Sequence, residues 1–234
     1  MPFISHESDI PGVAIGIWHI EEDELFFLER VKLYENEWKR LAGVVHPQKR
    51  LEWLSSRLCM KELLDITNTS RVESLNNDIG KPYLTNHSHN ISYTHSTQYS
   101  AAIASQTFEV GIDIEYLKRR RNIKTRFLFM NEPELASYEQ DPDFNRFILA
   151  WSAKETVYKL HGRGVAFKDN IFLDLQKVDP KANGILPATV QKDGLCKEYE
   201  VHFAVYPEFI LTYCIDGLPE STQQSLIRSG HQGN

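Results

Sequence analysis

Hydrophobic residues in the first third of the chain change from strand-like to helix-like spacing. Residues 14–20, AIGIWHI, are rich in β-branched and aromatic side chains, which predicts a strand. The segment LFFLERV (25–31) is predicted to be helical. Pro47 is well placed to begin a longer helix, because leucines recur behind it at helical spacing.

The middle of the chain reads as short extended segments. NNDIGKPYL (76–84) is predicted to form a turn and a short strand, and VGIDIE (110–115) a further strand. Between them, ISY (91–93) and SAAIAS (100–105) predict two strands around a polar break at 94–98. We therefore place the midpoint of the protein near residue 107.

The second half combines helices with later strands. Asn131 and Glu134 have the spacing of a capping box. Residues 143–161 predict a long helix that Gly162 ends. Strands with a turn at 192–194 follow, and the polar last residues predict a loose tail.

The long helix raises a question about charge. On a helical wheel Glu155 falls inside an apolar stripe, with Lys159 at one edge of the stripe and Lys154 at the other. A carboxylate on a core-facing stripe needs a cation or a metal nearby. The alternative is an internal Glu155–Lys159 pair one helical turn apart. The stripe is formed by Phe144, Phe147, Ile148, Trp151 and Tyr158.

A candidate metal site follows from the strand at 110–115. Side chains alternate between the two faces of a strand. The carboxylates of Asp113 and Glu115 therefore lie on one face, and Ile112 and Ile114 on the other. Together with Glu155 they could hold a hard cation such as Mg²⁺, which prefers carboxylates, water and substrate phosphates. The alternative is the polar outer face of an amphipathic strand.

Cationic side chains in the first half could meet phosphates. Arg57 and Lys61 lie on one stripe of the helix after Pro47, which could also be ordinary solvated surface. Lys81 follows a tight turn in GKP, and Thr94 and His95 lie in the polar break. Carboxylates for a metal together with scattered cations indicate chemistry on a phosphate ester.

Composition narrows the class of protein. The chain has 234 residues, 41% of them hydrophobic and 25% charged, which indicates a globular protein. A net charge of −6 argues against a nucleic-acid binder that depends on overall basicity. The three cysteines lack metal-site spacing, and we see neither a signal peptide nor a membrane span, so we expect a cytoplasmic protein.

The quoted motifs resemble one known family. VGIDIE followed by WSAKETVYK (151–159) resembles the paired signature of the 4′-phosphopantetheinyl transferases. GKPYL and ISYTHS upstream make the chain similar to the larger, Sfp-type branch. The resemblance implies an α+β fold, a pseudo-dimer of two similar α/β subdomains in one chain with the active site at their junction. We therefore expect subdomains at 1–107 and 108–220, with a tail at 221–234.

The resemblance also implies roles for individual residues. Asp113, Glu115 and Glu155 would hold Mg²⁺, and Asp113, Glu155 and Lys159 would be catalytic. Coenzyme A phosphates would meet a larger set of side chains. That set comprises Arg57, Lys61, Lys81, Thr94, His95, Lys154 and Lys159.

The activity that the resemblance implies is that of a holo-[acyl-carrier-protein] synthase. It would transfer 4′-phosphopantetheine from coenzyme A to a serine of an acyl or peptidyl carrier protein and release 3′,5′-ADP. We expect a monomer, and the basic run at 118–126 is either a docking patch for an acidic carrier or a solvated loop. Two alternatives stay open: a Mg²⁺-dependent nucleotide phosphohydrolase, and a non-catalytic module that binds coenzyme A or a carrier protein.

Overall fold

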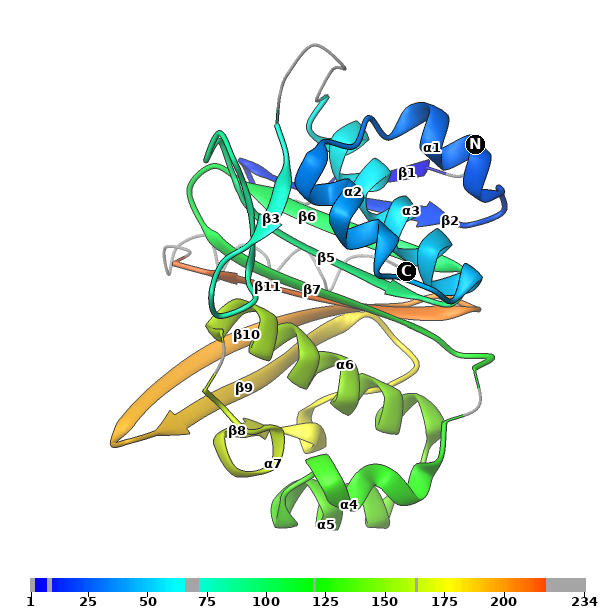
Figure 1. Cartoon of the computed structure of the whole chain (residues 1–234). Helices are drawn as coiled ribbons and strands as arrows, with labels where there is room; N and C mark the ends of the chain where they lie inside the picture. Colours follow the sequence, from blue (N-terminus) through cyan, green and yellow to red (C-terminus); the bar gives the residue numbers. More distant parts are fainter. Residues whose placement is uncertain (1–2, 8–9, 66–71, 120, 163, 218–234) are drawn as a thin grey trace.

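The chain forms two antiparallel sheets, each covered on its outer side by helices (Figure 1). The structure is a computed structural model, and it describes residues 3–7, 10–65, 72–119, 121–162 and 164–217. The predicted tail at 221–234 lies outside the described residues. The mixture of helices and antiparallel sheets agrees with the predicted α+β class.

The first half of the chain builds one sheet. Within the described residues it has six strands in the order β1-β2-β6-β5-β4-β3. Its strands are β1 (Phe3–Glu7), β2 (Val13–His19), β3 (Ser74–Asn76), β4 (Pro82–Leu84), β5 (Asn90–Ser96) and β6 (Tyr99–Ser105).

The second half builds the other sheet. Its five described strands run in the order β7-β11-β10-β9-β8. They are β7 (Glu109–Tyr116), β8 (Ile171–Leu173), β9 (Gly184–Lys192), β10 (Leu195–Val205) and β11 (Phe209–Asp216). No described strand crosses from one sheet to the other, and the change of sheet falls between β6 and β7, beside the predicted midpoint.

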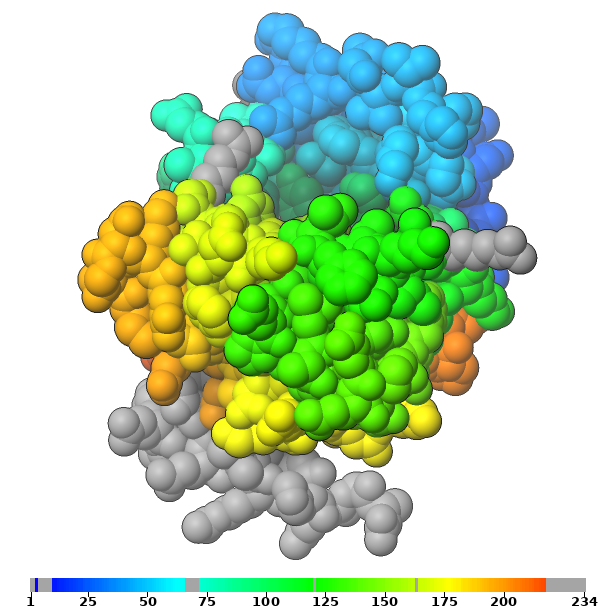
Figure 2. Space-filling view, turned by 90° about the horizontal axis from the view of Figure 1, so that it is seen from below, coloured from blue at the N-terminus to red at the C-terminus, as the bar shows by residue number. Residues whose placement is uncertain are grey.

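Helices cover the outer faces of both sheets. Figure 1 shows the first three helices above the first sheet and the later ones below the second; Figure 2 views the molecule from that lower end. The helices are α1 (Glu24–Arg30), α2 (Glu35–Ala42), α3 (Pro47–Leu63), α4 (Arg126–Phe129), α5 (Glu132–Gln140), α6 (Phe144–His161) and α7 (Phe167–Asn170), with short 3-10 turns at Ile123–Thr125 and Leu175–Lys177. Within the described ranges, none of the helices combines the length and the hydrophobicity that a membrane span requires.

A shared core joins the two sheets. Ile15 and Ile103 of the first sheet pack with Ile112, Ile114 and Leu211 of the second, and all five are almost fully buried. Each sheet also shares one further core with its own helices. The molecule therefore has four layers: helices, sheet, sheet and helices.

Local signals position the helix and strand that matter most. Asp143 caps the start of α6 by accepting hydrogen bonds from the Asn145 and Arg146 amides. Gly162 ends the helix with a positive φ of 94°, which favours glycine. The predicted capping box of Asn131 and Glu134 is also confirmed at the start of α5.

Gly111 allows α6 to approach β7 closely. A Cβ at this position would lie 2.5 Å from the Thr156 carbonyl oxygen and 2.9 Å from Leu160 Cβ. Only glycine avoids these clashes. The close approach places the carboxylates of β7 beside the side chains of α6.

Two sequence predictions need correction. The break expected at 94–98 is shorter, because Thr94, His95 and Ser96 continue strand β5 and only the turn at 97–98 interrupts the hairpin. The wheel also placed Glu155 on a core-facing stripe, whereas Trp151, Glu155 and Tyr158 lie on the less buried face of α6. The physical reason is that Ser152 and Thr156 of α6 face the sheet, where both bond the Thr212 hydroxyl of β11.

Candidate active site

A cavity lies between α3 and β5 of the first half and β7 and α6 of the second. Its volume is about 480 Å³. Both halves contribute charged side chains to it. The lining residues are Arg40, Trp53, Arg57, Asn76, Tyr93, Thr94, His95, Asp113, Glu115, Arg121, Trp151, Glu155 and Lys159.

Asp113 is the most heavily bonded carboxylate of the cavity. Its Oδ1 accepts hydrogen bonds from Thr94 Oγ1 at 2.8 Å and Lys159 Nζ at 2.7 Å, and its Oδ2 from Ser152 Oγ at 2.9 Å. The side chain is buried. Because these partners lie on β5 and α6, Asp113 ties both halves of the molecule to β7.

Glu115 lies two residues further along the same strand face, as the period-two spacing predicts. Its Oε1 accepts a hydrogen bond from Arg121, and its Oε2 one from Ser96 Oγ at 3.2 Å. Burial and the charge of Asp113 raise the pKa of Glu115, and Arg121 opposes this shift. The ionised form of Glu115 therefore depends on a nearby cation.

Glu155 differs from the other two carboxylates. Among the residues that the structure describes, none forms a hydrogen bond or ion pair with its carboxylate. Burial raises the pKa of Glu155 most, Lys159 opposes the shift, and the charges of Asp113 and Glu115 add to it. A bound cation or a proton would stabilise Glu155 here.

Lys159 bonds strand β7 and not Glu155. Its Nζ donates to Asp113 and also to the Ile112 carbonyl oxygen at 3.1 Å. No ion pair joins it to Glu155 within the described chain. The alternative of an internal Glu155–Lys159 ion pair is therefore wrong. Lys159 forms its hydrogen bonds with β7 instead.

The carboxylates of the cavity are the type of ligand that a hard cation prefers, but they do not form a complete set of metal ligands. Three carboxylates line one cavity, and their mutual repulsion would be relieved by a divalent ion. Among the described residues, however, no three His, Cys, Asp or Glu side chains form a group that could hold a metal ion. Arg121 and Lys159 bind Glu115 and Asp113 instead.

Arg57 is the principal cation of the opposite wall. Its guanidinium carbon lies 3.5 Å from the centre of the Trp53 ring, and its Nη2 donates to the Tyr93 hydroxyl at 3.1 Å. Burial lowers the pKa of Arg57. Arg40 lines the same wall and donates to Asn76 at 2.7 Å. A positive wall thus faces the carboxylates of β7.

His95 enters the cavity from β5 with a buried carboxylate behind it. Its Nδ1 lies 3.0 Å from Glu52 Oε2, and Lys49 Nζ lies 2.5 Å from the same oxygen. Burial alone would raise the pKa of Glu52, but hydrogen bonds from His95 and Lys49 outweigh it and lower the pKa to about 2. Glu52 therefore stays ionised and orients the His95 ring.

Two predicted lysines of the first half lie outside this cavity. Lys61 Nζ donates to the Lys32 carbonyl oxygen at 2.5 Å and lies 3.7 Å from Glu37. Lys81 forms an ion pair with Glu109 near the end of α6. Arg57, Thr94 and His95 line the cavity with the predicted residues of β7 and α6, whereas Lys61 and Lys81 do not.

The role predicted for Lys154 needs correction. Its side chain is fully buried, and its Nζ bonds Glu134 at 2.8 Å and the carbonyl oxygens of Phe167 at 2.7 Å and Ile171 at 2.6 Å. These bonds leave no donor for a phosphate. Lys154 therefore holds α5, α6 and α7 together and does not line the cavity.

Sequence reasoning missed several lining residues. Arg40, Asn76 and Tyr93 come from segments whose convergence depends on how α2 and β3 pack beside β5. Arg121 was seen only as part of a basic run. Its one local signal is its position a few residues after the Asp113–Glu115 strand.

Comparison with known families bears on the second half of the chain. The family whose model matches residues 109–214 is the 4′-phosphopantetheinyl transferase superfamily. The matched segment runs from β7 into β11 and contains Asp113, Glu115, Glu155 and Lys159. No curated protein matches this chain. The half that carries the carboxylates is thus similar to enzymes that transfer phosphopantetheine.

Proposed function

We propose that this protein transfers 4′-phosphopantetheine from coenzyme A to a serine of an acyl or peptidyl carrier protein, and releases 3′,5′-ADP. One observation carries the proposal. The carboxylates and the lysine of the superfamily-like half face the cations of the other half across one cavity. This arrangement suits a substrate that bears several phosphates.

The proposed roles follow the contacts in the cavity. Asp113, Glu115 and Glu155 would hold Mg²⁺, which when bound would neutralise charge on the pyrophosphate. Arg57 and His95 would bind coenzyme A phosphates, with Thr94 beside them. Lys61 and Lys81 are left out because they lie outside the cavity.

Glu155 is the proposed general base. It is the carboxylate that the described residues leave without a hydrogen bond, so it can accept the proton of the carrier serine, either directly or through a water molecule. The serine oxygen then attacks the β-phosphorus of coenzyme A, and the bond to 3′,5′-ADP breaks. Lys159, fixed by Asp113 and the Ile112 carbonyl, would stabilise charge on the departing group.

The fold suits the Sfp-type arrangement of two subdomains in one chain. We propose subdomains at 1–107 and 108–220, because the chain changes sheet between β6 and β7. Since both contribute to one cavity, a monomer would carry a complete site. The unpaired cysteines, Cys59, Cys196 and Cys214, are compatible with the proposed cytoplasmic location.

The decisive experiment is intact-protein mass spectrometry. An apo acyl carrier protein is incubated with this protein, coenzyme A and Mg²⁺, with EDTA as the control. We expect a gain of one phosphopantetheine that EDTA abolishes. The Asp113→Ala and Glu155→Ala variants should lose transfer while circular dichroism shows a retained fold.

Other outcomes would select an alternative. Release of 3′,5′-ADP from coenzyme A without any carrier would indicate a phosphohydrolase. Binding of coenzyme A without metal and without turnover, over several carrier types, would indicate a binding module. Near-normal transfer by either carboxylate variant would contradict the proposed site.

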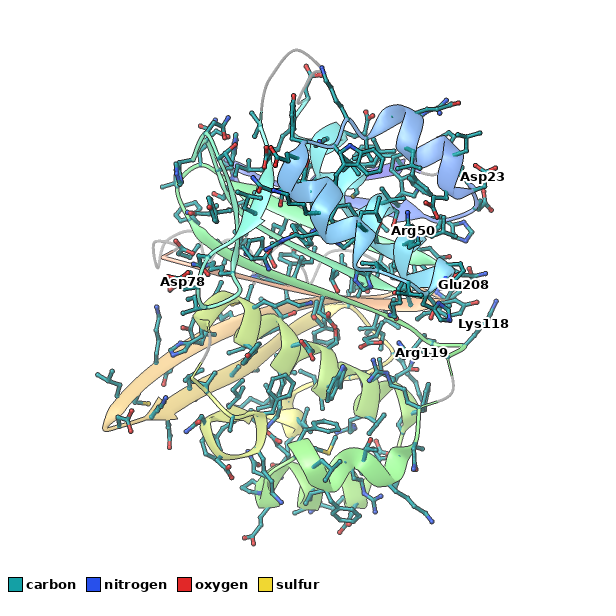
Figure 3. The ribbon with its side chains drawn as sticks, viewed as in Figure 1. Asp23, Arg50, Asp78, Lys118, Arg119 and Glu208 are labelled. Atoms are coloured by element: carbon teal, nitrogen blue, oxygen red, sulfur yellow. The ribbon has the colours of Figure 1, made fainter. Side chains whose placement is uncertain are left out.

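The proposed docking surface for the carrier protein is formed by residues that come directly after β7 in the sequence. Lys118 is paired with Glu208, and Figure 3 shows both near Arg119 at one end of the molecule. Arg119 and Lys124 are exposed, and so are the apolar side chains of nearby Phe127 and Leu128. This combination suits an acidic partner with an apolar contact.

Charge reversal tests the carrier surface. The double change Arg119→Glu and Lys124→Glu should raise the KM for an acidic carrier protein severalfold at low salt, because steering is lost. The KM for coenzyme A should stay the same, since neither residue lines the cavity. An unchanged carrier KM at low ionic strength would remove this surface from the proposal.

A further inference from the structure

Arg121 forms an ion pair with Glu115, a carboxylate that a bound cation would also use. Glu115 is 5% exposed, and both of its carboxylate oxygens are taken, Oε1 by Arg121 and Oε2 by Ser96. A hard cation binds through such oxygens at short distance. The positive charge of Arg121 therefore competes with that of a divalent ion for Glu115 Oε1.

Arg121 is held less firmly than Lys159, the basic group that bonds Asp113 of the same strand. It lies on irregular backbone between β7 and the turn at Ile123–Thr125, and its buried Nε has no hydrogen-bond partner among the described residues. Lys159, by contrast, is fixed on α6 and donates to both Asp113 and a backbone carbonyl. Of the two cations, Arg121 can leave its carboxylate with less disturbance of the fold.

The guanidinium also contacts a group other than Glu115. The Arg121 guanidinium carbon lies 5.0 Å from the centre of the Trp151 ring, within range of a cation–π contact. The side chain is 22% exposed, so it also reaches the cavity and solvent. If Arg121 leaves Glu115, the Trp151 ring and solvent remain available to its charge.

We propose that Arg121 is a latch on Glu115, which a divalent cation must displace, and that it thereby sets the affinity of the cavity for that cation. The inference rests on the proposed function, because it takes Glu115 as a metal ligand. In the latched state the guanidinium neutralises one of two neighbouring buried carboxylates, which would otherwise be costly. The latch explains why the three carboxylates do not form a ready metal site among the described residues.

The test measures cation binding rather than turnover. Mn²⁺ serves as the probe, and free Mn²⁺ is followed by electron paramagnetic resonance with the full-length protein, without coenzyme A or carrier. Arg121→Ala should lower the Kd for Mn²⁺ on the order of tenfold, because the competing charge is gone. Arg121→Lys should give a smaller change, since a lysine retains the charge but not the paired geometry.

Matched variants separate competition from a general change of charge. Arg119→Ala removes the same charge from an exposed neighbour, and it should change the Kd by less than about twofold because solvent screens it. Combined with Glu115→Gln, Arg121→Ala should have no further effect. Thermal melts show which variants are folded, and Arg121→Lys provides the test if the alanine variant is not.

The outcomes distinguish the latch from the proposed function. Suppose the wild type binds Mn²⁺ and Glu155→Gln weakens that binding. An unchanged or weaker affinity in Arg121→Ala then overturns the latch and leaves the proposed function standing. If the wild type does not bind Mn²⁺, or binds it independently of Glu155, the proposed metal site fails and the latch fails with it.

Discussion

At the scale of single residues, Glu52 shows how one buried carboxylate organises the cavity. It is 2% exposed and receives hydrogen bonds from His95 and Lys49. His95 is a proposed phosphate ligand, so the carboxylate behind it determines which ring nitrogen faces the cavity. The same contact links the stability of the fold to pH.

The acid stability of the protein should depend on Glu52. Its pKa is lowered to about 2 in the folded state from a usual value of 4.5. A lowered pKa stabilises the fold above the usual value, and this contribution is lost as pH falls from about 4.5 towards 2. Glu52→Gln should therefore make the Tm less dependent on pH across this interval, as measured by thermal melts.

Glu35 provides the matched control for this prediction. It also pairs with a lysine, Lys39, but its side chain is exposed. Solvent screening makes such pairs weak, so Glu35→Gln should leave the slope of Tm against pH nearly unchanged. Parallel curves for the wild type and Glu52→Gln would show that the buried contact does not contribute.

At the scale of elements, the contact between β7 and α6 determines where the catalytic side chains lie. Gly111 faces the backbone of α6, and a Cβ there would clash with the Thr156 carbonyl oxygen at 2.5 Å. Gly111→Ala should cost about 1–3 kcal/mol in the free energy of unfolding, because overpacking forces the two elements apart. Urea denaturation measures this loss.

Gly111→Ala should also affect activity in the fraction that remains folded. Moving α6 outward separates Lys159 from Asp113, so phosphopantetheine transfer should fall more than stability explains. Gly184→Ala is the control, since that glycine lies on β9 and its nearest neighbours are atoms of the Phe203 ring. Full activity of folded Gly111→Ala would show that the close approach serves packing alone.

The pair of Lys154 and Glu134 fixes α6 to α5. Burial lowers the pKa of Lys154 and raises that of Glu134, and each partner opposes the shift of the other. Lys154→Met should cost about 3–5 kcal/mol, because it leaves a buried carboxylate without its cation. The double change with Glu134→Leu should recover much of that loss in urea denaturation. Equal losses in the single and double variants would contradict this account.

Local patterns in the sequence predicted the bounds of these elements better than they predicted which side chains contact one another. The carboxylates of β7 and the bounds of α6 follow from period-two spacing and from caps at Asp143 and Gly162. The role of Lys154 could not be predicted, because its partners lie on α5, α7 and β8. The wheel likewise shows which face of a helix is apolar but not which face meets a sheet.

The cavity wall of the first half illustrates the same limit. Arg57 was predicted from a basic stripe, but the same stripe included Lys61, which the fold turns toward Glu37. Arg40 carried no local signal at all. The packing of α2 and α3 over the sheet determines which cationic side chains reach the cavity. That packing cannot be read from a single sequence.

At the scale of the whole molecule, the two sheets share a core, so neither half should unfold alone. Leu58 is buried between the first sheet and its helices, and Val157 between the second sheet and its helices. Leu58→Ala should cost about 2–5 kcal/mol and Val157→Ala somewhat less. Because the core between the sheets couples the halves, each change should lower the unfolding midpoint of both.

Hydrogen exchange with mass spectrometry in increasing urea can follow the two halves separately. Peptides from β2 and β6 report on the first half, and peptides from β9 and β10 report on the second. In Leu58→Ala both groups should shift to the same lower urea midpoint. If peptides of the second half keep the wild-type midpoint, the shared core does not couple the halves. The cavity could then open without loss of either sheet, and its two walls would be free to move apart when substrate binds.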